Sequence, residues 1–312
     1  MSRILVLGGA GYLGAPVTAR LGALPGATVL HGGRAAPDGG GGAGGRPAPD
    51  LPADLGTVPV DVLAGGLAAL GPDVVVNCAG LTGGPASTLA AVNARGPAAL
   101  CEAMAAAVPA ARLVQLGSAA EYGPGTPGTP VHESAAARPA GVYGATKLAG
   151  TLAVTGSGLD AVVLRVFNPV GPGAPASGLP GRLAAAFRAA PPDGAVRTGD
   201  LGAYRDFVDV NDVAAAVALA ATAAGPLPPV LNIGSGRARP ARDLAAELAG
   251  LAGFTGRIEE SGAGSERSAA ASWVCADIAL AAAALGWQPA RTLRDALAAL
   301  WLTTAPAAGA SA

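Results

Sequence analysis

A tyrosine, a lysine and a serine in the middle of the chain have the types and spacing needed for proton transfer. Tyr143 and Lys147 stand four residues apart, so on a helix the phenol and the ammonium share one face. An ammonium beside a phenol favours the phenolate, which lets a tyrosine act as a general acid or base near neutral pH. Ser118 comes at the C-terminal end of the expected strand that includes 113–116 and would deliver a hydroxyl to a substrate oxygen. These three residues are the predicted catalytic set.

The composition gives Lys147 further weight. It is the only lysine of the chain, whereas lysine and arginine together number 20. An ammonium is a compact point charge with three donors, and a guanidinium is a rigid planar fork. Because the chain uses arginine at its other basic positions, the lysine at residue 147 indicates that this site requires a compact ammonium and not a guanidinium.

A second group of residues, near the N-terminus, has the pattern of a nucleotide-phosphate site. The apolar run 4–7 leads into a turn with glycine at its first, fourth and seventh positions, followed by a helical stretch. The first glycine permits the tight turn, the second lets the backbone approach a pyrophosphate, and the third allows close packing of helix on strand. The expected cofactor-binding residues of this turn are Gly8, Gly11, Tyr12, Leu13 and Gly14.

The end of the second apolar run bears on the choice between NAD and NADP. An NAD site usually has an acid there to hold the ribose 2'-hydroxyl, but residues 29–33 lead into Arg34 without one. Arg34 would offer a 2'-phosphate a charge-assisted bidentate partner; the alternative is a solvated surface arginine. The sequence favours NADP(H) and leaves NAD(H) as the second choice.

Two further pairs of residues would complete the nucleotide site. Asp61 and Val62 follow an expected third strand over 58–60 and would contact the adenine, unless Asp61 caps a helix. Ala79 and Gly80 follow the expected strand over 74–77. Their small size leaves room for a cofactor at the carboxyl edge of the sheet, where doubly wound folds bind ligands.

The elements that must position these residues alternate between short apolar strands and alanine-rich helices. This alternation predicts an α/β fold, a doubly wound parallel sheet of the Rossmann type. The expected strands are 4–7, 28–30, 58–60, 74–77, 112–116 and 162–166, and the expected helices 15–24, 92–107 and 143–155. Later elements are helices at 181–190, 241–251 and from 211 and 293, and strands at 204–210, 230–233 and near 257–260.

Less regular patterning after residue 170 indicates a second, smaller part. We expect an NAD(P)-binding domain over 1–170, completed by parts of 204–235, and a mainly substrate-binding lobe over 171–302. The glycine-rich stretch 38–45 is expected to be a surface loop, and 303–312 a frayed tail.

Charge and hydropathy exclude several classes of protein. The 312 residues carry a net charge of −1 and are 51% hydrophobic, which is typical of a globular chain and not of a nucleic-acid binder. The mean hydropathy of +0.44 comes from alanine, without a run long enough to span a membrane. The three cysteines lack metal-type spacing, so neither a metal site nor a disulfide is expected. With no secretory segment at the N-terminus, we expect a cytoplasmic protein.

With these motifs the chain resembles the extended short-chain dehydrogenase/reductase family, which contains NAD(P)-dependent nucleotide-sugar epimerases, dehydratases and ketoreductases. The resemblance covers nearly the whole chain and implies a Rossmann-type domain, a small C-terminal lobe, and Ser118, Tyr143 and Lys147 as the catalytic set. It rests on the ordered motifs at 8–14, 118–123, 143–147, 165–171, 204–210, 231–236 and 285–287.

The resemblance also implies substrate-binding and cofactor-binding roles for further residues. Asn168, Arg205 and Arg267 stand where relatives grip the diphosphate of a sugar nucleotide; the alternative for Arg205 is an ion pair with a neighbouring aspartate. Ala119, beside Ser118, is expected to contact substrate. Phe167 and Val170, with Tyr143 and Lys147, are expected to contact the cofactor. A homodimer through helices 92–107 and 143–155 is the expected assembly.

The residues after Ser118 bear on the reaction. Dehydratases of this family have an aspartate and a glutamate there, and this chain has Ala119 and Ala120, which move no protons. The preferred hypothesis is an NADPH-dependent ketoreductase acting on a nucleotide-linked keto-deoxysugar, since Arg34 points to an exchangeable cofactor. The alternatives are an NAD-dependent nucleotide-sugar epimerase, a ketoreductase of a non-sugar, polyketide-type ketone, and a non-catalytic NAD(P)-binding sensor.

Overall fold

The computed structural model describes residues 2–34, 48–261 and 272–304, and it divides into two compact units. The first comprises Met1–Glu121, Val142–Arg165 and Ala214–Leu231, and the second Tyr122–Gly141, Val166–Val213 and Asn232–Ala312. The chain therefore passes between the units several times, and each is described below by itself.

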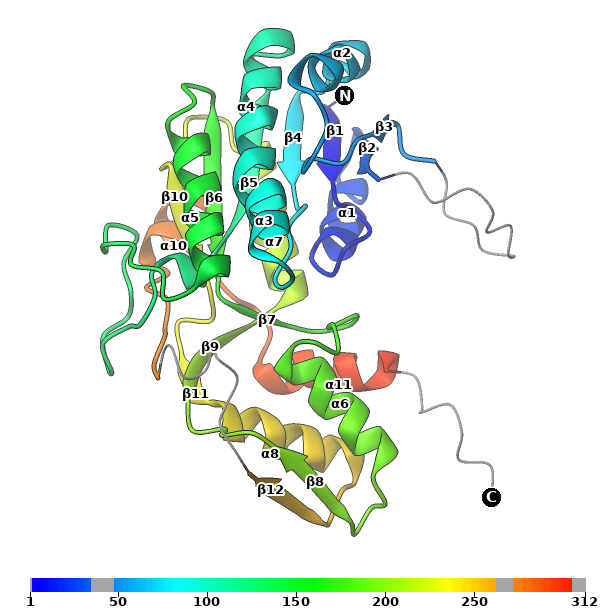
Figure 1. Ribbon diagram of the computed structural model, residues 1–312, viewed down its shortest axis with the longest axis vertical. Coiled ribbons are helices and arrows are strands. Elements are labelled where there is room, and N and C mark those ends of the chain that lie inside the picture. Colours follow the sequence, from blue (N-terminus) through cyan, green and yellow to red (C-terminus); the bar gives the residue numbers. More distant parts are fainter. Residues whose placement is uncertain (1, 35–47, 262–271, 305–312) are drawn as a thin grey trace. The chain divides into compact units, whose positions relative to one another are not determined.

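A seven-stranded sheet organises the first unit, in the order β10-β6-β5-β4-β1-β2-β3 (Figure 1). β1 pairs in parallel with β2 and β4, β2 with β3, and β4 with β5. This is the doubly wound α/β sheet that the sequence predicts, and its winding direction switches between β1 and β4. The strands are β1 (Ser2–Leu7), β2 (Ala27–Gly33), β3 (Leu51–Pro52), β4 (Val74–Asn77), β5 (Arg112–Ser118), β6 (Ala161–Val166) and β10 (Val230–Ile233), the last two reaching into the second unit.

Burial on both faces explains why these strands are almost continuously apolar. Every residue of β4 and β5 is buried, as are the last four residues of β1. In Figure 1, α4 and α5 lie over the near face of this sheet. The helices are α1 (Gly14–Gly22), α2 (Val60–Leu70), α3 (Ala86–Ala90), the π-helix η1 (Ala91–Arg95), α4 (Gly96–Ala107), the 3-10 turn η2 (Ala119–Glu121), α5 (Val142–Thr155) and α7 (Val210–Thr222), which straddles the two units.

The expected third strand over 58–60 is wrong. The structure has β3 at Leu51–Pro52, and Val60 is the first residue of α2. The amide of Val58 donates to the carbonyl of Asp54, 2.7 Å away, so this stretch is a turn that buries the Val58 side chain in the core. A short apolar run does not by itself separate a strand from a buried turn before a helix.

The second unit holds two small sheets and a separate helical core. β7 (Asn168–Val170), β9 (Tyr204–Asp209) and β11 (Ala238–Pro240) form one sheet, and β8 (Ala195–Thr198) pairs in parallel with β12 (Arg257–Glu260). Leu183, Phe187, Leu244 and Leu297 belong to its core. Its helices are α6 (Leu179–Ala189), α8 (Ala241–Ala252), α10 (Ala279–Leu285) and α11 (Leu293–Thr303).

The helices and strands expected after residue 170 are confirmed, within a few residues. β7, β8, β11 and α10 are additional; β7 and β11, with three residues each, are too short to show a period in the sequence. The expected loop at 38–45 lies outside the described residues, as does most of the expected tail, while Thr303 is the last residue of α11.

Candidate active site

The glycine turn after β1 has no room for side chains at its first and third glycines. Gly8 has a φ of +73°, and a Cβ there would lie 2.8 Å from the backbone of Ala79. A Cβ on Gly14 would overlap the carbonyl oxygen of Gly8. α1 therefore begins directly against the turn, as the spacing of the three glycines predicts.

The middle of the turn is open. Gly11 is exposed, and a Cβ on it would meet only the carbonyl oxygen of Gly8, at 3.2 Å. Tyr12 and Leu13 are half-buried beside it, and no side chain among the described residues caps the N-terminus of α1. Backbone amides of an uncapped helix start, preceded by an open glycine, suit a phosphate group.

The end of β4 lies beside this turn. Asn77 is fully buried; its amide donates to the side chain of Gln115 on β5, at 2.8 Å, and its Oδ1 accepts from the amide of Ala79, at 3.0 Å. These contacts fix Ala79 and Gly80 at the switch between β1 and β4. Open α/β sheets bind ligands at such a switch point.

The residues expected to contact adenine are in a different place. Asp61 and Val62 lie in the first turn of α2, where both are exposed, because the strand expected before them does not exist. The residues that follow the real third strand are Asp54 and Leu55, which sequence reasoning missed. One oxygen of Asp54 accepts from the amide of Gly56, at 2.9 Å. An aspartate two residues before a glycine is the signal for such a turn.

The residues near the end of β2 include an acid as well as the expected arginine. Arg34 is exposed directly after the strand. Asp50, which sequence reasoning did not consider, accepts from the amide of His31 on β2, with 2.7 Å between Oδ2 and N. Nineteen residues separate the two in the chain, so only the pairing of β3 with β2 brings Asp50 there.

The elements that carry the predicted catalytic set, β5 and α5, meet at one edge of the sheet. Ser118 is the last residue of β5, and its Oγ accepts from the amide of Ala120, at 3.2 Å. Lys147 donates from Nζ to the carbonyl oxygen of Leu116, at 2.5 Å. α5 is thereby held against the end of β5, and Tyr143 lies one turn before Lys147 on the same helix.

The Lys147 ammonium is buried next to the switch point. Burial lowers the pKa of Lys147, while the Glu121 carboxylate and the Cys78 thiol act in the opposite direction. A Cβ on Gly80 would lie 3.8 Å from its Nζ. Burial raises the pKa of Cys78 to about 12, so this cysteine is a neutral thiol.

Sequence reasoning missed the buried charges behind Ser118. The Glu121 carboxylate accepts from the backbone amide of Ser118 (2.8 Å), from the hydroxyl of Thr151 (2.9 Å) and from Nε of Arg165 (2.7 Å). The available signal was a charged residue, Arg165, inside the otherwise apolar strand β6.

Asn93, in the π-helix, is a second residue that the sequence did not reveal. Its side chain binds the backbone of Leu81 at both the amide (2.9 Å) and the carbonyl (2.8 Å), and it also donates to the hydroxyl of Thr146, at 3.3 Å. Asn93 thus links the loop after β4 to α5.

The residues expected to hold a diphosphate belong to the second unit. Asn168 on β7 donates to the carbonyl of Asp206 on β9, at 3.1 Å, and Arg205 precedes Asp206. Burial lowers the pKa of Arg205. The Asp206 carboxylate accepts from Ser235, Gly236 and Ala276. Arg267 lies outside the described residues.

Three other expected contact residues are buried. Ala119 begins η2, directly after Ser118. Phe167 donates from its backbone amide to Ile233, and Val170 is part of the core of the second unit. Their side chains are therefore committed to packing.

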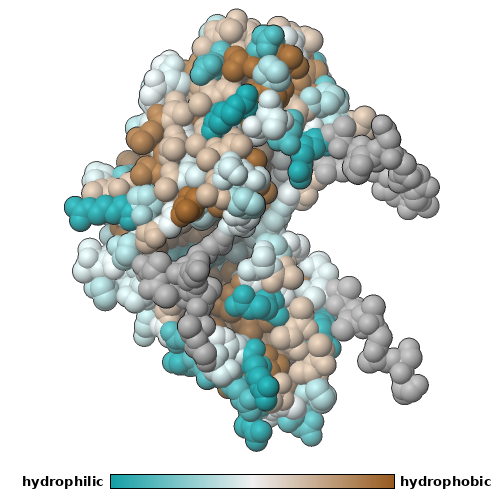
Figure 2. Space-filling view, in the orientation of Figure 1, coloured by the Kyte–Doolittle hydropathy of each residue, from teal (hydrophilic) through white to brown (hydrophobic). Residues whose placement is uncertain are grey.

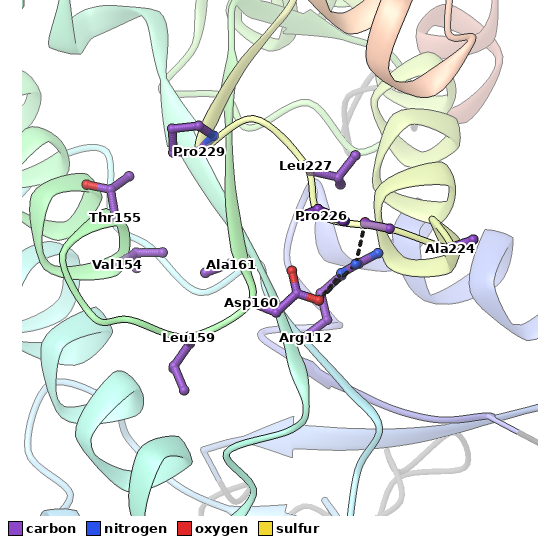
Figure 3. Close-up of a pocket in the computed structure, with 11 residues that line it drawn as sticks. Arg112, Val154, Thr155, Leu159, Asp160, Ala161, Ala224, Pro226, Leu227 and Pro229 are labelled. Atoms are coloured by element: carbon purple, nitrogen blue, oxygen red, sulfur yellow. Dashed lines mark hydrogen bonds and ion pairs between the residues drawn. The ribbon is translucent and has the colours of Figure 1, made fainter.

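The first unit also has a cavity of about 520 Å³ at the opposite edge of the sheet, where the strands begin. Arg112 and Asp160 lie in it, joined by an ion pair of 2.8 Å (Figure 3). Arg112 donates further to the carbonyls of Ala220, Ala223 and Gly225. Its donors are thus used within the protein, where they bind the C-terminal end of α7 and the segment that follows it.

The chain is similar in sequence and in fold to known proteins. A family model described as the NAD dependent epimerase/dehydratase family matches residues 4–234. A dTDP-6-deoxy-L-talose 4-dehydrogenase (NAD(P)(+)) of Kitasatospora kifunensis is 42% identical over 206 residues. That match covers 63% of this chain and 64% of the relative, so the chain spans less than two thirds of the relative's length.

Solved structures match over almost the whole chain. MoeE5 in complex with UDP-glucuronic acid and NAD is 27% identical, with a TM-score of 0.80 over 97% of this chain and 98% of that one. RMD from Pseudomonas aeruginosa, complexed with NADPH, is 24% identical, with a TM-score of 0.79 and the same coverage. In the described part of the chain, no helix is long and apolar enough to cross a membrane.

Proposed function

The chain belongs to the NAD dependent epimerase/dehydratase family, and from this premise we propose that it is an NAD(P)H-dependent ketoreductase of a nucleotide-linked keto-deoxysugar. The observation that carries the proposal is the convergence of Ser118 and Lys147 at the sheet edge that also carries the open glycine turn. The name of the Kitasatospora relative supports a deoxysugar linked to a thymidine diphosphate, with C4 as the reacting carbon.

The glycine turn fits the diphosphate of a nicotinamide dinucleotide, because Gly8 and Gly14 exclude side chains and Gly11 is open to solvent. Gly11, Tyr12 and Leu13 would hold the diphosphate, and Ala79 and Gly80 would border the rest of the cofactor. Asp54 and Leu55 take the role for adenine that the sequence assigned to Asp61 and Val62, since they follow the third strand. Arg34 would hold a 2'-phosphate.

When bound, the nicotinamide supplies the hydride. Ser118 would donate a hydrogen bond to the carbonyl oxygen of the substrate, and Tyr143 would give that oxygen a proton as the alkoxide forms. The charge left on the phenolate is stabilised by the Lys147 ammonium until solvent returns the proton. Each of these steps uses a group at the carboxyl end of β5 or on the first turns of α5.

Ala119 and Ala120 support reduction over dehydration. They form η2 with Glu121, at the place where elimination of water would need an acid and a base. Glu121 is the acid closest in sequence, and its carboxylate is already bound to Ser118, Thr151 and Arg165. Hydride and proton transfer need neither alanine to react.

For the substrate's diphosphate we retain Asn168, Arg205 and Arg267, while Ala119, whose side chain is buried, would reach the sugar only through its backbone. Two guanidiniums and an amide suit a diphosphate chemically. Phe167 and Val170, whose side chains are buried, would reach the cofactor only through backbone groups.

An NAD-dependent epimerase is the second candidate, and Asp50 is the observation that favours it. This acid is held against β2 by the amide of His31, and NAD enzymes of this fold keep an acid near the end of that strand. An epimerase would retain its cofactor through both half-reactions, whereas a ketoreductase exchanges it.

The deciding experiment denatures the purified protein and identifies any released nucleotide. The emptied, refolded protein is then titrated with NADPH and NADH and assayed with a thymidine-diphosphate 4-keto-6-deoxysugar. Absence of bound nucleotide, tighter binding of NADPH and oxidation of one NADPH per ketone support the ketoreductase. Stoichiometric, tightly held NAD with no net NADPH consumption would replace it with the epimerase, and nucleotide binding without turnover of any ketone would favour a sensor.

We also propose that the protein is a homodimer assembled through α5. Val142 and Leu152 are 50% and 62% exposed, and the exposed Ala145 and Ala149 lie between them on one helical face. Figure 2 shows hydrophobic residues among pale ones over α4 and α5. A Leu152→Glu variant should sediment as a monomer, and Leu302→Glu, at an exposed leucine of α11, should remain dimeric. A wild-type monomer at micromolar concentration would contradict the proposal.

A further inference from the structure

The buried pair of Glu121 and Arg165 is not required by the hydride and proton transfers described above. Glu121 is 0% exposed and Arg165 5%, and their side chains meet at 2.7 Å. Removing two charges from water commonly costs more than their attraction returns, and apolar residues in their place are often at least as stabilising. All other residues of β6 are apolar, so packing alone does not explain an arginine there.

The contacts of Glu121 join the elements that carry the catalytic set. Its Oε1 accepts from the backbone amide of Ser118 at the end of β5, and its Oε2 accepts from the hydroxyl of Thr151 on α5. Thr151 is one turn beyond Lys147, which itself donates to Leu116 of β5. One carboxylate thus closes a ring of contacts between β5, η2 and α5.

Gly117 provides the space that this carboxylate needs. A Cβ on Gly117 would lie 2.9 Å from Oε1 of Glu121 and 2.8 Å from a methyl group of Val163. Glycine inside a strand weakens the strand and often marks a close approach by another group. In β5 the approaching groups are the carboxylate behind Ser118 and the neighbouring strand.

Few charged groups act on the Lys147 ammonium. The Glu121 carboxylate of η2, which is paired with Arg165 on β6, acts to raise the pKa of Lys147, and so does Cys78 after the end of β4. Tyr143 is the titratable group on its own helix, one turn earlier. Glu121 is therefore the negative charge that opposes the effect of burial on Lys147.

We propose that Glu121 is a positioning residue: its carboxylate fixes the backbone at Ser118, binds Thr151 on α5 and brings a negative charge to the buried side chain of Lys147, one turn after Tyr143. The consequence for catalysis rests on the proposed function, whereas the effect on Lys147 does not. Arg165 in turn pairs with the Glu121 carboxylate in its buried site.

The single lysine makes the proposal directly measurable. In protein labelled with 15N-lysine, the side chain of Lys147 gives one signal, and its titration reports the pKa of Lys147. Glu121→Gln keeps the shape and removes the charge, so the pKa of Lys147 should fall by about one unit. Glu121→Asp keeps the charge and shortens the reach, so the pKa should change less while kcat still falls, because Ser118 loses its support.

Two further variants guard against unfolding and against a purely structural effect. Glu121→Gln combined with Arg165→Met removes both charges, and the pKa of Lys147 should fall again, by less than in the single variant. Thr151→Val removes one hydrogen bond of Glu121 and keeps its charge, so the pKa should not change. The alkaline limb of the kcat profile for ketone reduction should move to lower pH with the pKa of Lys147, while KM for the ketone stays the same.

An unchanged pKa of Lys147 in the folded double variant would overturn the proposal, as would a shifted pKa without movement of the alkaline limb. The titration needs no substrate, so it separates this proposal from the proposed function. A protein that reduces no keto-sugar but shows the shift supports the role of Glu121 at Lys147 and refutes the ketoreductase. Reduction of the sugar without any shift refutes only the role of Glu121.

Discussion

Lys147 donates a hydrogen bond to the carbonyl oxygen of Leu116, with 2.5 Å between the nitrogen and the oxygen. Leu116 is two residues before Ser118 on β5, so this contact sets the register between the helix that carries Tyr143 and the strand that ends in Ser118. The buried position leaves space for a compact ammonium. This buried site explains in physical terms why the chain, whose other basic residues are arginines, has a lysine here.

We therefore expect Lys147→Arg to be nearly as inactive as Lys147→Met, although it keeps the positive charge. Loss of a positioned proton-transfer set lowers kcat by about 100-fold or more, and a planar guanidinium does not fit the place of the ammonium. The measurement is steady-state reduction of the ketone, with NADPH binding as the control for an intact nucleotide site. Wild-type turnover by Lys147→Arg would contradict the prediction.

Gly8→Ala should destabilise the protein by about 1–3 kcal/mol, since it forces a side chain into a left-handed backbone and against Ala79. The matched control is Gly22→Ala at the end of α1, where a Cβ meets nothing within 4 Å. That substitution should raise the free energy of unfolding by about 0.5–1 kcal/mol. Urea denaturation measures the free energy of unfolding of both variants. Equal changes in the two would contradict the prediction that the backbone at Gly8 excludes a side chain.

Arg34→Ala should raise the KM for NADPH and leave that for NADH unchanged. Loss of a charge-assisted hydrogen bond weakens binding by about 1.5–3 kcal/mol, or roughly 10-fold to 100-fold. Arg20→Ala, at another exposed arginine in the last turn of α1, is the control for a general change of charge. Equal effects on the two cofactors would remove the basis for preferring NADPH.

The start of α11 should respond to acid. Hydrogen bonds from the hydroxyl and the amide of Thr292 lower the pKa of Asp295 below its ordinary value of 3.8. A lowered pKa stabilises the fold above the unfolded value, and this contribution disappears as the pH falls through the folded value. Asp295→Ala should therefore lower Tm at neutral pH, with a gap that closes as the pH falls below 3.8.

Thr292→Ala is the comparison for that experiment. It also removes the bond from the amide of Asp295 to the hydroxyl of Thr292, which does not depend on ionisation. Its deficit in Tm should persist in acid. A gap for Asp295→Ala that is constant with pH would show that the carboxylate contributes no charge-dependent stability.

The sequence predicts those parts of the fold that show a local pattern of apolar residues. The apolar runs of β1, β4, β5 and β6 are buried on both faces, so they stand out without any tertiary information. The two-residue strand Leu51–Pro52 does not, because it is defined only by its pairing with Gly32 and Gly33. Its omission moved the expected adenine contacts from the turn at Asp54 to a helix.

The candidate site divides in the same way. Gly8, Ser118, Tyr143 and Lys147 follow patterns of fixed spacing, so sequence reasoning finds them. Glu121 acquires its role through Arg165, 44 residues later, and a hydrogen bond of that span leaves no period in the sequence. The role of Glu121 therefore depends on contacts that exist only in the folded protein.

The π-helix between α3 and α4 gives Asn93 its direction. In an α-helix each residue advances the side chain by about 100° around the axis, and a π-helical turn holds one extra residue. Deleting a single alanine from Ala91–Arg95 would let residues 86–107 wind as one regular helix. Asn93 would then swing about a quarter-turn away from Leu81 and Thr146, and the loop after β4 would lose its link to α5. The one extra residue of the π-helix thus orients the Asn93 side chain, and through it the loop after β4 stays joined to the helix that bears Lys147.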